Sequence, residues 1–360
     1  MIKFLNIPNQ DKHIQKIIIS SIKKIINNND FIMGKSVLKF EENFAKFCNS
    51  KFAISCANGT DALTIALKIL NLPKNSEVII PAMTYCSTAF AVINANLKPV
   101  LVDNDKDNPV ISAESIKKKI NKNTRVIMPV HLYGSVADLN KIKKLIRGKK
   151  IVLLDDCSQS HGAKLGNKKI GSIADISCFS LYPGKNLGAY GDAGIITTSN
   201  KTYYKKIKNF RNLGSDKKFI HTQVGFNSRL DSIQAIVLNN KLKSLNKYNK
   251  KRVIIAKKYD RLIKNKKISK LKYSKFSVYH QYVILVNNRN ALIKKLSKNK
   301  IQYGLHYPKS INQLDVLKKF FSNEKYPNAE NLAKKCVSLP IDPLLKPQEV
   351  NKIIKVLNTF

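Results

Sequence analysis

Short apolar runs alternate with segments of helical spacing from about residue 52 onward, and this alternation constrains the fold more than any other feature. Runs such as 52–56, 77–82 and 151–156 have the length and composition of buried strands. Strands that alternate with helices predict an α/β fold, in which a mainly parallel central sheet carries helices on both faces. Ligands of such sheets bind beyond the carboxyl ends of the strands, so we expect the functional residues there.

The remaining elements follow the same pattern. Further strands are expected at 99–103, 125–130, 175–180 and 194–198, and helices near 12–27, 60–70, 88–96, 113–120 and 138–146. Residues 31–47 predict a turn and then an amphipathic helix with apolar residues at helical spacing, namely Val37, Phe40, Phe44 and Phe47.

The last part of the chain has a different pattern of expected elements. A long helical stretch at roughly 229–248 and a helix that resumes near 252 lead into it. It contains a strand-like run and two helical segments, at 278–286, 290–298 and 347–357. We predict a large domain of residues 1–250, which includes an N-terminal arm, and a smaller C-terminal α+β domain of residues 251–360.

The formal net charge of +42 invites comparison with nucleic-acid-binding proteins. Only seven of the 65 basic residues are arginines, however, and the 58 lysines are spread along the whole chain. A protein that reads nucleic acid more often concentrates arginine on one element for bidentate contacts. We therefore expect solvated lysines, no specific nucleic-acid partner and only weak, salt-sensitive binding to polyanions.

The six cysteines lie far apart and form no CxxC pair, so we expect reduced, mostly buried thiols and no metal site. No apolar run approaches the roughly 20 residues that a membrane-spanning helix needs. The first fifteen residues lack the apolar core of a secretory signal. The expectation is a cytoplasmic protein without a membrane partner.

The segment IVLLDDCSQSHGA, residues 151–163, ends a buried strand with Asp155 and Asp156. An aspartate at a strand end often caps the next turn. Alternatively, a buried carboxylate here pairs with a heterocyclic nitrogen and keeps it protonated, as pyridoxal 5′-phosphate (PLP) requires. Both interpretations are open from this segment alone.

The segment CFSLYPGKNLGAYGDAG, residues 178–194, places Lys185 in a loop rich in glycine and proline just past a strand. Such loops approach ligands closely. A phosphate-binding P-loop is excluded, because the motif GxxxxGK[ST] needs glycine and serine or threonine where this chain has Phe179 and Asn186. A solvated lysine is the alternative.

In SCANGTDALTIAL, residues 55–67, a strand meets a helix through Asn58, Gly59 and Thr60. Backbone N–H groups at a helix start, with a threonine hydroxyl, form an anion site. Ordinary capping of the helix by Asn58 or Thr60 is the competing interpretation.

Together these segments resemble the DegT/StrS-type (DegT/DnrJ) sugar aminotransferases, a branch of the fold-type I PLP enzymes. The resemblance extends from FIMGKSVLKFE near residue 31 to HYP at 306–308. It includes NGTDAL, EVIIPAMTY, HLYG at 131–134 and GFNSRLDSIQA at 225–235. Several motifs in the same order are far more specific than any one of them.

The resemblance implies a role for each matching residue. Lys185 matches the lysine that holds PLP as a Schiff base, and Asp156 the carboxylate on the pyridinium nitrogen. Gln159 and Tyr85 match the residues on the phenolic oxygen and on the ring face. Gly59, Thr60 and Ser180 match the residues that bind the phosphate. Asn227 matches a residue that reaches the phosphate from a neighbouring subunit, which implies a homodimer with shared active sites. His306 and Tyr307 resemble the sugar-side segment, and His161 has no derived role.

The resemblance further implies transfer of an amino group from glutamate to a nucleoside-diphosphate keto-sugar, at C3 of a dTDP-linked 3-keto-6-deoxyhexose. Three alternatives exist. A sugar dehydratase of the same family has histidine in place of the lysine, and Lys185 argues against it. The others are a regulatory or binding protein that has lost catalysis, and a nucleic-acid-binding protein that only the net charge favours.

Overall fold

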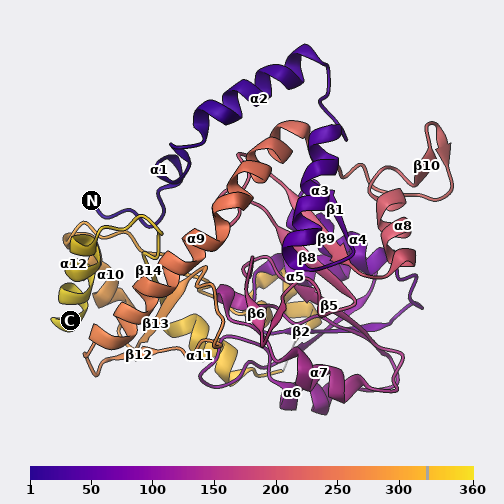
Figure 1. Cartoon of the computed structure of the whole chain (residues 1–360). Helices are drawn as coiled ribbons and strands as arrows, with labels where there is room; N and C mark the ends of the chain where they lie inside the picture. Colours follow the sequence, from indigo (N-terminus) through magenta and orange to yellow (C-terminus); the bar gives the residue numbers. More distant parts are fainter. Residues whose placement is uncertain (322–323) are drawn as a thin grey trace.

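The computed structural model describes residues 1–321 and 324–360, and its centre is a seven-stranded sheet (Figure 1). The strand order is β1 (Phe52–Cys56), β9 (Gly194–Thr198), β8 (Ile176–Ser180), β5 (Val152–Asp156), β4 (Thr124–Ile127), β2 (Glu77–Pro81) and β3 (Lys98–Val102). Only β9 runs antiparallel to its neighbours in this sheet. The predicted α/β fold with a mainly parallel sheet is confirmed.

Helices cover both faces of this sheet, and the strands alternate their side chains between two cores. In β2, Val78 and Ile80 join one core and Ile79 joins the other. The first core is closed by α4 (Gly59–Lys68), α5 (Cys86–Asn94), α8 (Lys201–Phe210) and α11 (Pro327–Lys335). The second is closed by α3 (Lys35–Cys48), α6 (Ala113–Lys119), α7 (Leu139–Ile146) and α9 (Ser232–Leu262). Burial on both sides explains why the strands are continuous apolar runs in the sequence.

The N-terminal arm consists of α1 (Ile7–Asp11) and α2 (Gln15–Asn27). Figure 1 shows α2 at the outer edge of the molecule, with only the upper half of α9 beneath it. Ile18 and Ile25 pack on Val237 of α9, while Ile19 and Ile26 on the other side of α2 are more than half exposed. The arm begins beside the C-terminal region, where the amide of Ile2 donates to the carbonyl of Lys300.

Helix α9 runs without a break through position 250, so the predicted interruption between residues 248 and 252 is wrong. Asn249 and Arg252 are buried, and Asn249 makes hydrogen bonds with Asn186 and with the carbonyl of His161. Buried polar partners distant in sequence therefore keep this stretch helical.

The C-terminal region has its own antiparallel sheet of β12 (Ile268–Lys270), β13 (Tyr282–Val286) and β14 (Cys336–Leu339). Helices α10 (Arg289–Lys298) and α12 (Pro347–Asn358) share a third core with it. The division into domains at residue 250 stays a prediction. None of the described helices is long and apolar enough to cross a membrane.

Candidate active site

The residues singled out in the sequence gather at the carboxyl edge of the central sheet. Asp156 is the last residue of β5 and Ser180 the last residue of β8. Gly59 begins α4 shortly after the end of β1. These three strands lie in the same part of the sheet, so residues more than a hundred positions apart converge at one edge.

The loop before α4 lies directly against Ser180. A Cβ on Gly59 would lie 2.5 Å from the Cβ of Ser180, so only glycine allows this approach. Asn58 caps the helix by accepting the amide of Asp61 at 2.8 Å, so the predicted capping interaction is present and does not use the amides of Gly59 and Thr60. Because the first N–H groups of a helix have no partner within it, the amides of Gly59 and Thr60 are available to an anion.

The two aspartates of β5 point in opposite directions, as successive strand residues do. Asp156 faces the site, where its Oδ2 accepts the hydroxyl of Thr88 at 3.0 Å and its Oδ1 accepts the amide of Ser158 at 3.0 Å. Asp155 faces away and bonds to His131. The structure therefore separates the two carboxylates that the strand pattern left equivalent.

Lys185 lies in the loop between β8 and β9, and its amide donates to the carbonyl of Tyr182 at 2.9 Å. Gly188 closes this loop, since a Cβ there would lie 2.4 Å from the carbonyl oxygen of Pro183. Burial lowers the pKa of Lys185 to about 8, and the charge of Asp156 opposes part of that shift. An amine with this pKa is neutral in a substantial fraction near neutral pH, unlike a solvated lysine.

Tyr85, Gln159 and Tyr307 lie together at the site, and of the three only Tyr85 is exposed. The rings of Tyr85 and Tyr307 lie 5.4 Å apart, and the Gln159 amide nitrogen donates to the Tyr307 hydroxyl at 3.1 Å. The Tyr85 side chain is 53% exposed, which leaves one face of its ring free. The C-terminal segment HYP therefore meets the loop after β5, although 148 positions separate Gln159 from Tyr307.

His306 is turned toward the C-terminal sheet. Its Nδ1 is 2.8 Å from the hydroxyl of Ser338, and its ring stacks on Phe4 at 5.8 Å. Burial lowers the pKa of His306 to about 4, which keeps the ring neutral. Its hydrogen bonds and ring contacts involve none of the cofactor candidates, whereas Tyr307 bonds to Gln159, so the structure brings Tyr307 into the site more directly than His306.

Asn227 is exposed in the single chain and pairs through its backbone with Asn212. Its neighbour Ser228 anchors this segment to the loop before α4, because its hydroxyl donates to Asp61 at 2.7 Å and accepts the amide of Ala57 at 3.0 Å. Asn227 thus directly precedes Ser228, which anchors this segment near the phosphate candidates Gly59 and Thr60, but it is itself exposed to solvent.

His161 is fully buried, with its ring 5.4 Å from that of Phe179. Burial, and the nearby charge of Lys185, lower the pKa of His161 to about 3. A neutral ring packed on phenylalanine favours a packing role for this residue.

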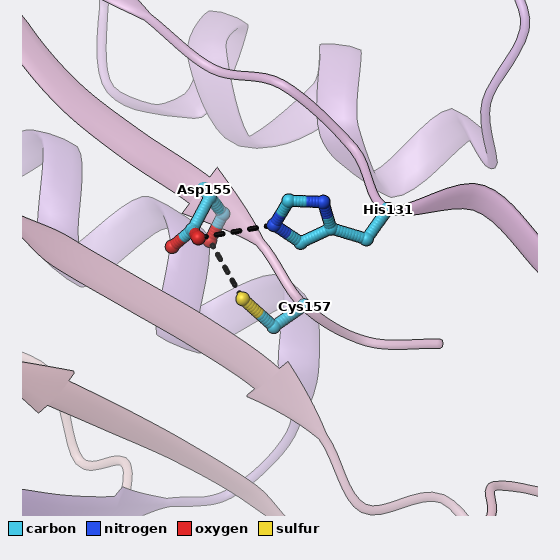
Figure 2. Close-up of side chains that lie close together, drawn as sticks. All are labelled: His131, Asp155 and Cys157. Atoms are coloured by element: carbon cyan, nitrogen blue, oxygen red, sulfur yellow. Dashed lines mark hydrogen bonds and ion pairs between the residues drawn. The ribbon is translucent and has the colours of Figure 1, made fainter. Parts of the chain in front are cut away.

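A second polar cluster lies under the sheet edge, where Figure 2 shows His131, Asp155 and Cys157 pointing toward one another. The His131 Nδ1 accepts the amide of Ala137 at 3.1 Å, so its Nε2 carries the hydrogen and donates to Asp155 at 3.1 Å. Burial raises the pKa of Cys157 well above its ordinary value, so the sulfur stays a thiol. Both ring nitrogens of His131 are thus engaged in hydrogen bonds, which fix the position of Asp155 next to Asp156 in the strand.

Sequence reasoning gave no function to Thr88 or Tyr133, which the structure ties to the site. Thr88 lies within an expected helix and Tyr133 within the HLYG motif, so the sequence indicated the local setting of both residues. Their partners were not, because Asp156 and Gln159 belong to another element.

Comparison with known proteins shows which family the chain belongs to. The chain matches the model of the DegT/DnrJ/EryC1/StrS aminotransferase family over residues 12–358. The dTDP-3-amino-3,6-dideoxy-alpha-D-galactopyranose transaminase of Aneurinibacillus thermoaerophilus is 35% identical, over 100% of this chain and 99% of that protein. The UDP-2-acetamido-2-deoxy-3-oxo-D-glucuronate aminotransferase of Pseudomonas aeruginosa is 32% identical, over 99% of each.

Solved structures of sugar aminotransferases have the same fold as this chain. S. venezuelae DesV in complex with a ketimine intermediate has a TM-score of 0.96 and 29% identity, and the match covers 99% of this chain and 98% of that one. A Bacillus subtilis structure with bound cofactor PMP has a TM-score of 0.92 and 26% identity, with coverage of 99% and 84%.

Fold and site together define an aminotransferase of fold-type I that depends on PLP. The chain belongs to the DegT/DnrJ/EryC1/StrS aminotransferase family, and like its relatives it is a sugar aminotransferase.

Proposed function

We propose that this enzyme moves an amino group from glutamate to a nucleoside-diphosphate keto-sugar, with Lys185 and Asp156 as the catalytic residues. The convergence of Lys185, Asp156 and Gln159 at one sheet edge, with Tyr307 closing it, carries the proposal. In this arrangement one amine of lowered pKa lies within electrostatic reach of one buried carboxylate, and one amide follows in the loop after the same strand.

The residues present fit PLP group by group. The amides of Gly59 and Thr60, with Ser180 against them, suit the phosphate, and the Asp156 carboxylate suits a protonated ring nitrogen. Gln159 offers an amide to the phenolic oxygen, and Tyr85 offers a ring face. When bound, PLP supplies an electron sink for negative charge on the carbon that loses a proton.

The chain itself supplies binding and proton transfer. Lys185 Nζ, once free of the cofactor, accepts a proton at pH values near its pKa and can return it to a neighbouring carbon. Asp156 is held in place for this role because Thr88 and Ser158 both donate to its carboxylate. Burial raises the pKa of Tyr307, so its hydroxyl remains a hydrogen-bond donor toward the substrate side.

For the acceptor we propose a 3-keto sugar on a nucleoside diphosphate, with dTDP as the favoured nucleotide. The names of the two curated relatives both place the amino or oxo group at C3, on a dTDP-sugar in one and on a UDP-sugar in the other. The test is a panel of 3-keto and 4-keto sugars on dTDP, UDP and GDP with glutamate, and product regiochemistry by NMR. Amination at C4 alone, or no amination with any sugar, would contradict the proposal.

We also propose a homodimer in which Asn227 serves the phosphate of the partner's site. Asn227 is exposed, and the nearby β10–β11 hairpin (Ser215–Lys217, Ile220–His221) carries Phe219 at 84% exposure. Val224, between the hairpin and Asn227, is 94% exposed. Figure 1 shows this hairpin projecting from the body of the molecule. Large apolar side chains in a projecting segment fit burial against a second copy.

Subunit mixing tests this arrangement. In a heterodimer of Lys185→Ala and Asn227→Ala chains, shared sites give one site with both native residues, whereas separate sites give none. We expect the heterodimer to recover tight PLP binding in about half of its sites. If no site of the heterodimer recovers tight PLP binding, the shared arrangement is wrong. The proposed aminotransferase function would not be affected by that result.

A further inference from the structure

Tyr133 occupies an unusual position next to the site. It lies in the turn η1 (Leu132–Gly134) after β4, fully buried, with φ of 58° and ψ of 10°. A residue other than glycine in this left-handed region costs about 1–3 kcal/mol, and such residues cluster at functional sites. Other contacts must therefore hold Tyr133 in place.

Every polar group of Tyr133 bonds to a residue distant in sequence. Its amide donates to the Gln159 Oε1 at 2.6 Å, and its hydroxyl donates to the carbonyl of His306. Its carbonyl accepts the amide of Gln281 at 3.3 Å. One residue thus joins the loop after β5 to two segments of the C-terminal region.

The bond to Gln159 fixes which way the amide of that side chain faces. Because the Tyr133 amide occupies Oε1, the NH2 group must face the opposite way, where it donates to the Tyr307 hydroxyl. Tyr133, Gln159 and the 306–307 segment form a closed ring of hydrogen bonds.

We propose that Tyr133 is a positioning residue, which turns the NH2 of Gln159 toward the oxygen of the cofactor ring and ties the 306–307 segment over that ring. The inference rests on the proposed placement of the ring against Gln159. Tyr133 itself touches neither cofactor nor substrate in this role.

Tyr133→Phe removes only the hydroxyl that holds His306. We expect the PLP dissociation constant of this variant to rise about tenfold, because a buried carbonyl loses its donor and the segment over the ring loosens. Tyr259→Phe is the matched control, since Tyr259 is also fully buried and its hydroxyl donates to the carbonyl of Pro340 at 2.8 Å in the C-terminal region. It should lower the melting temperature and leave PLP binding unchanged.

Gln159→Glu tests the orientation of the amide. The variant keeps an acceptor for the Tyr133 amide but replaces the NH2 by an anionic oxygen. A donor lost and a charge gained at the ring oxygen should both raise the pH midpoint of the visible absorbance of bound PLP, by about one unit or more. An unchanged midpoint would show that the NH2 of Gln159 does not face the ring.

Combining Tyr133→Phe with Tyr307→Phe tests the ring of hydrogen bonds. Both hydroxyls act on one segment, so the double variant should weaken PLP binding by less than the product of the single effects. Multiplying effects, or a Tyr133→Phe variant that binds PLP like Tyr259→Phe, would overturn the inference. If the wild-type protein showed no visible PLP band, the cofactor placement itself would fail, which is a separate result.

Discussion

The hydroxyl of Thr88, near the start of α5, donates a hydrogen bond of 3.0 Å to Oδ2 of Asp156 at the end of β5. A second threonine, Thr84, lies 2.9 Å from the Thr88 hydroxyl. This chain of hydroxyls links the loop and helix that follow β2 to the carboxylate that we assign to the cofactor nitrogen. These hydrogen bonds orient the Asp156 carboxylate before any ligand binds.

Asp156→Asn should leave PLP bound and lower kcat by at least about a hundredfold. The amide still accepts from Ser158 but no longer holds a charged nitrogen, so roughly 3 kcal/mol of transition-state stabilisation is lost. Steady-state kinetics and the visible spectrum measure the two effects. Asp175→Asn is the control, because Asp175 accepts the amide of Leu153 away from the site. Retained activity in Asp156→Asn would remove this carboxylate from the mechanism.

Thr88→Val should lower kcat/KM by about ten- to a hundredfold, because one hydrogen bond to a charged group contributes about 1.5–3 kcal/mol. The shape of the side chain is preserved, so the fold should be unaffected. Thr197→Val, which removes a similar buried hydroxyl bonded to the carbonyl of Gly171, should leave kcat/KM at the wild-type value. Equal effects from both substitutions would mean that Thr88 acts through stability alone.

Lys185→Met should stabilise the PLP-free protein at pH 7 by about 1–2 kcal/mol, with allowance for partial solvent exposure of the side chain. Burial lowers the pKa of Lys185 to about 8, so the folded protein binds the proton less tightly than the unfolded chain. The penalty is present in full below pH 8 and fades as the pH rises toward 10.5, so the gap between variant and wild type should narrow.

Chemical denaturation at several pH values measures that gap. Lys143→Met, at an exposed lysine of α7, should show no pH-dependent difference from the wild type. A Lys185→Met variant less stable than wild type at pH 7 would contradict the lowered pKa. The same variant should also lack the absorbance band that borohydride removes from the wild-type protein.

His131→Ala should cost about 2–4 kcal/mol of stability, because Asp155 would stay buried without its donor. His221→Ala, at an exposed histidine, should stay within about 0.5 kcal/mol. Thermal unfolding measures both. EDTA should change neither the melting temperature nor turnover, and a loss that zinc restores would instead show that His131, Asp155 and Cys157 bind a metal.

Much of the fold was determined by the sequence. Alternating apolar runs predicted the parallel sheet and its flanking helices, because burial on both faces demands such runs. The ordered motifs around Lys185 and Asp156 predicted the family, which the whole-chain match confirms. The placement of the residues at strand ends followed from the topology of α/β sheets.

Only the tertiary structure decided how these residues act together. It separated Asp156 from Asp155, kept α9 continuous through Asn249, and joined Gln159 to Tyr133 and Tyr307. Periodicity reports which face of an element is buried, since that depends on near neighbours in the chain. Hydrogen-bond partners such as Tyr133 and His306, which lie 173 positions apart, leave no such trace, because their pairing depends on how whole elements pack.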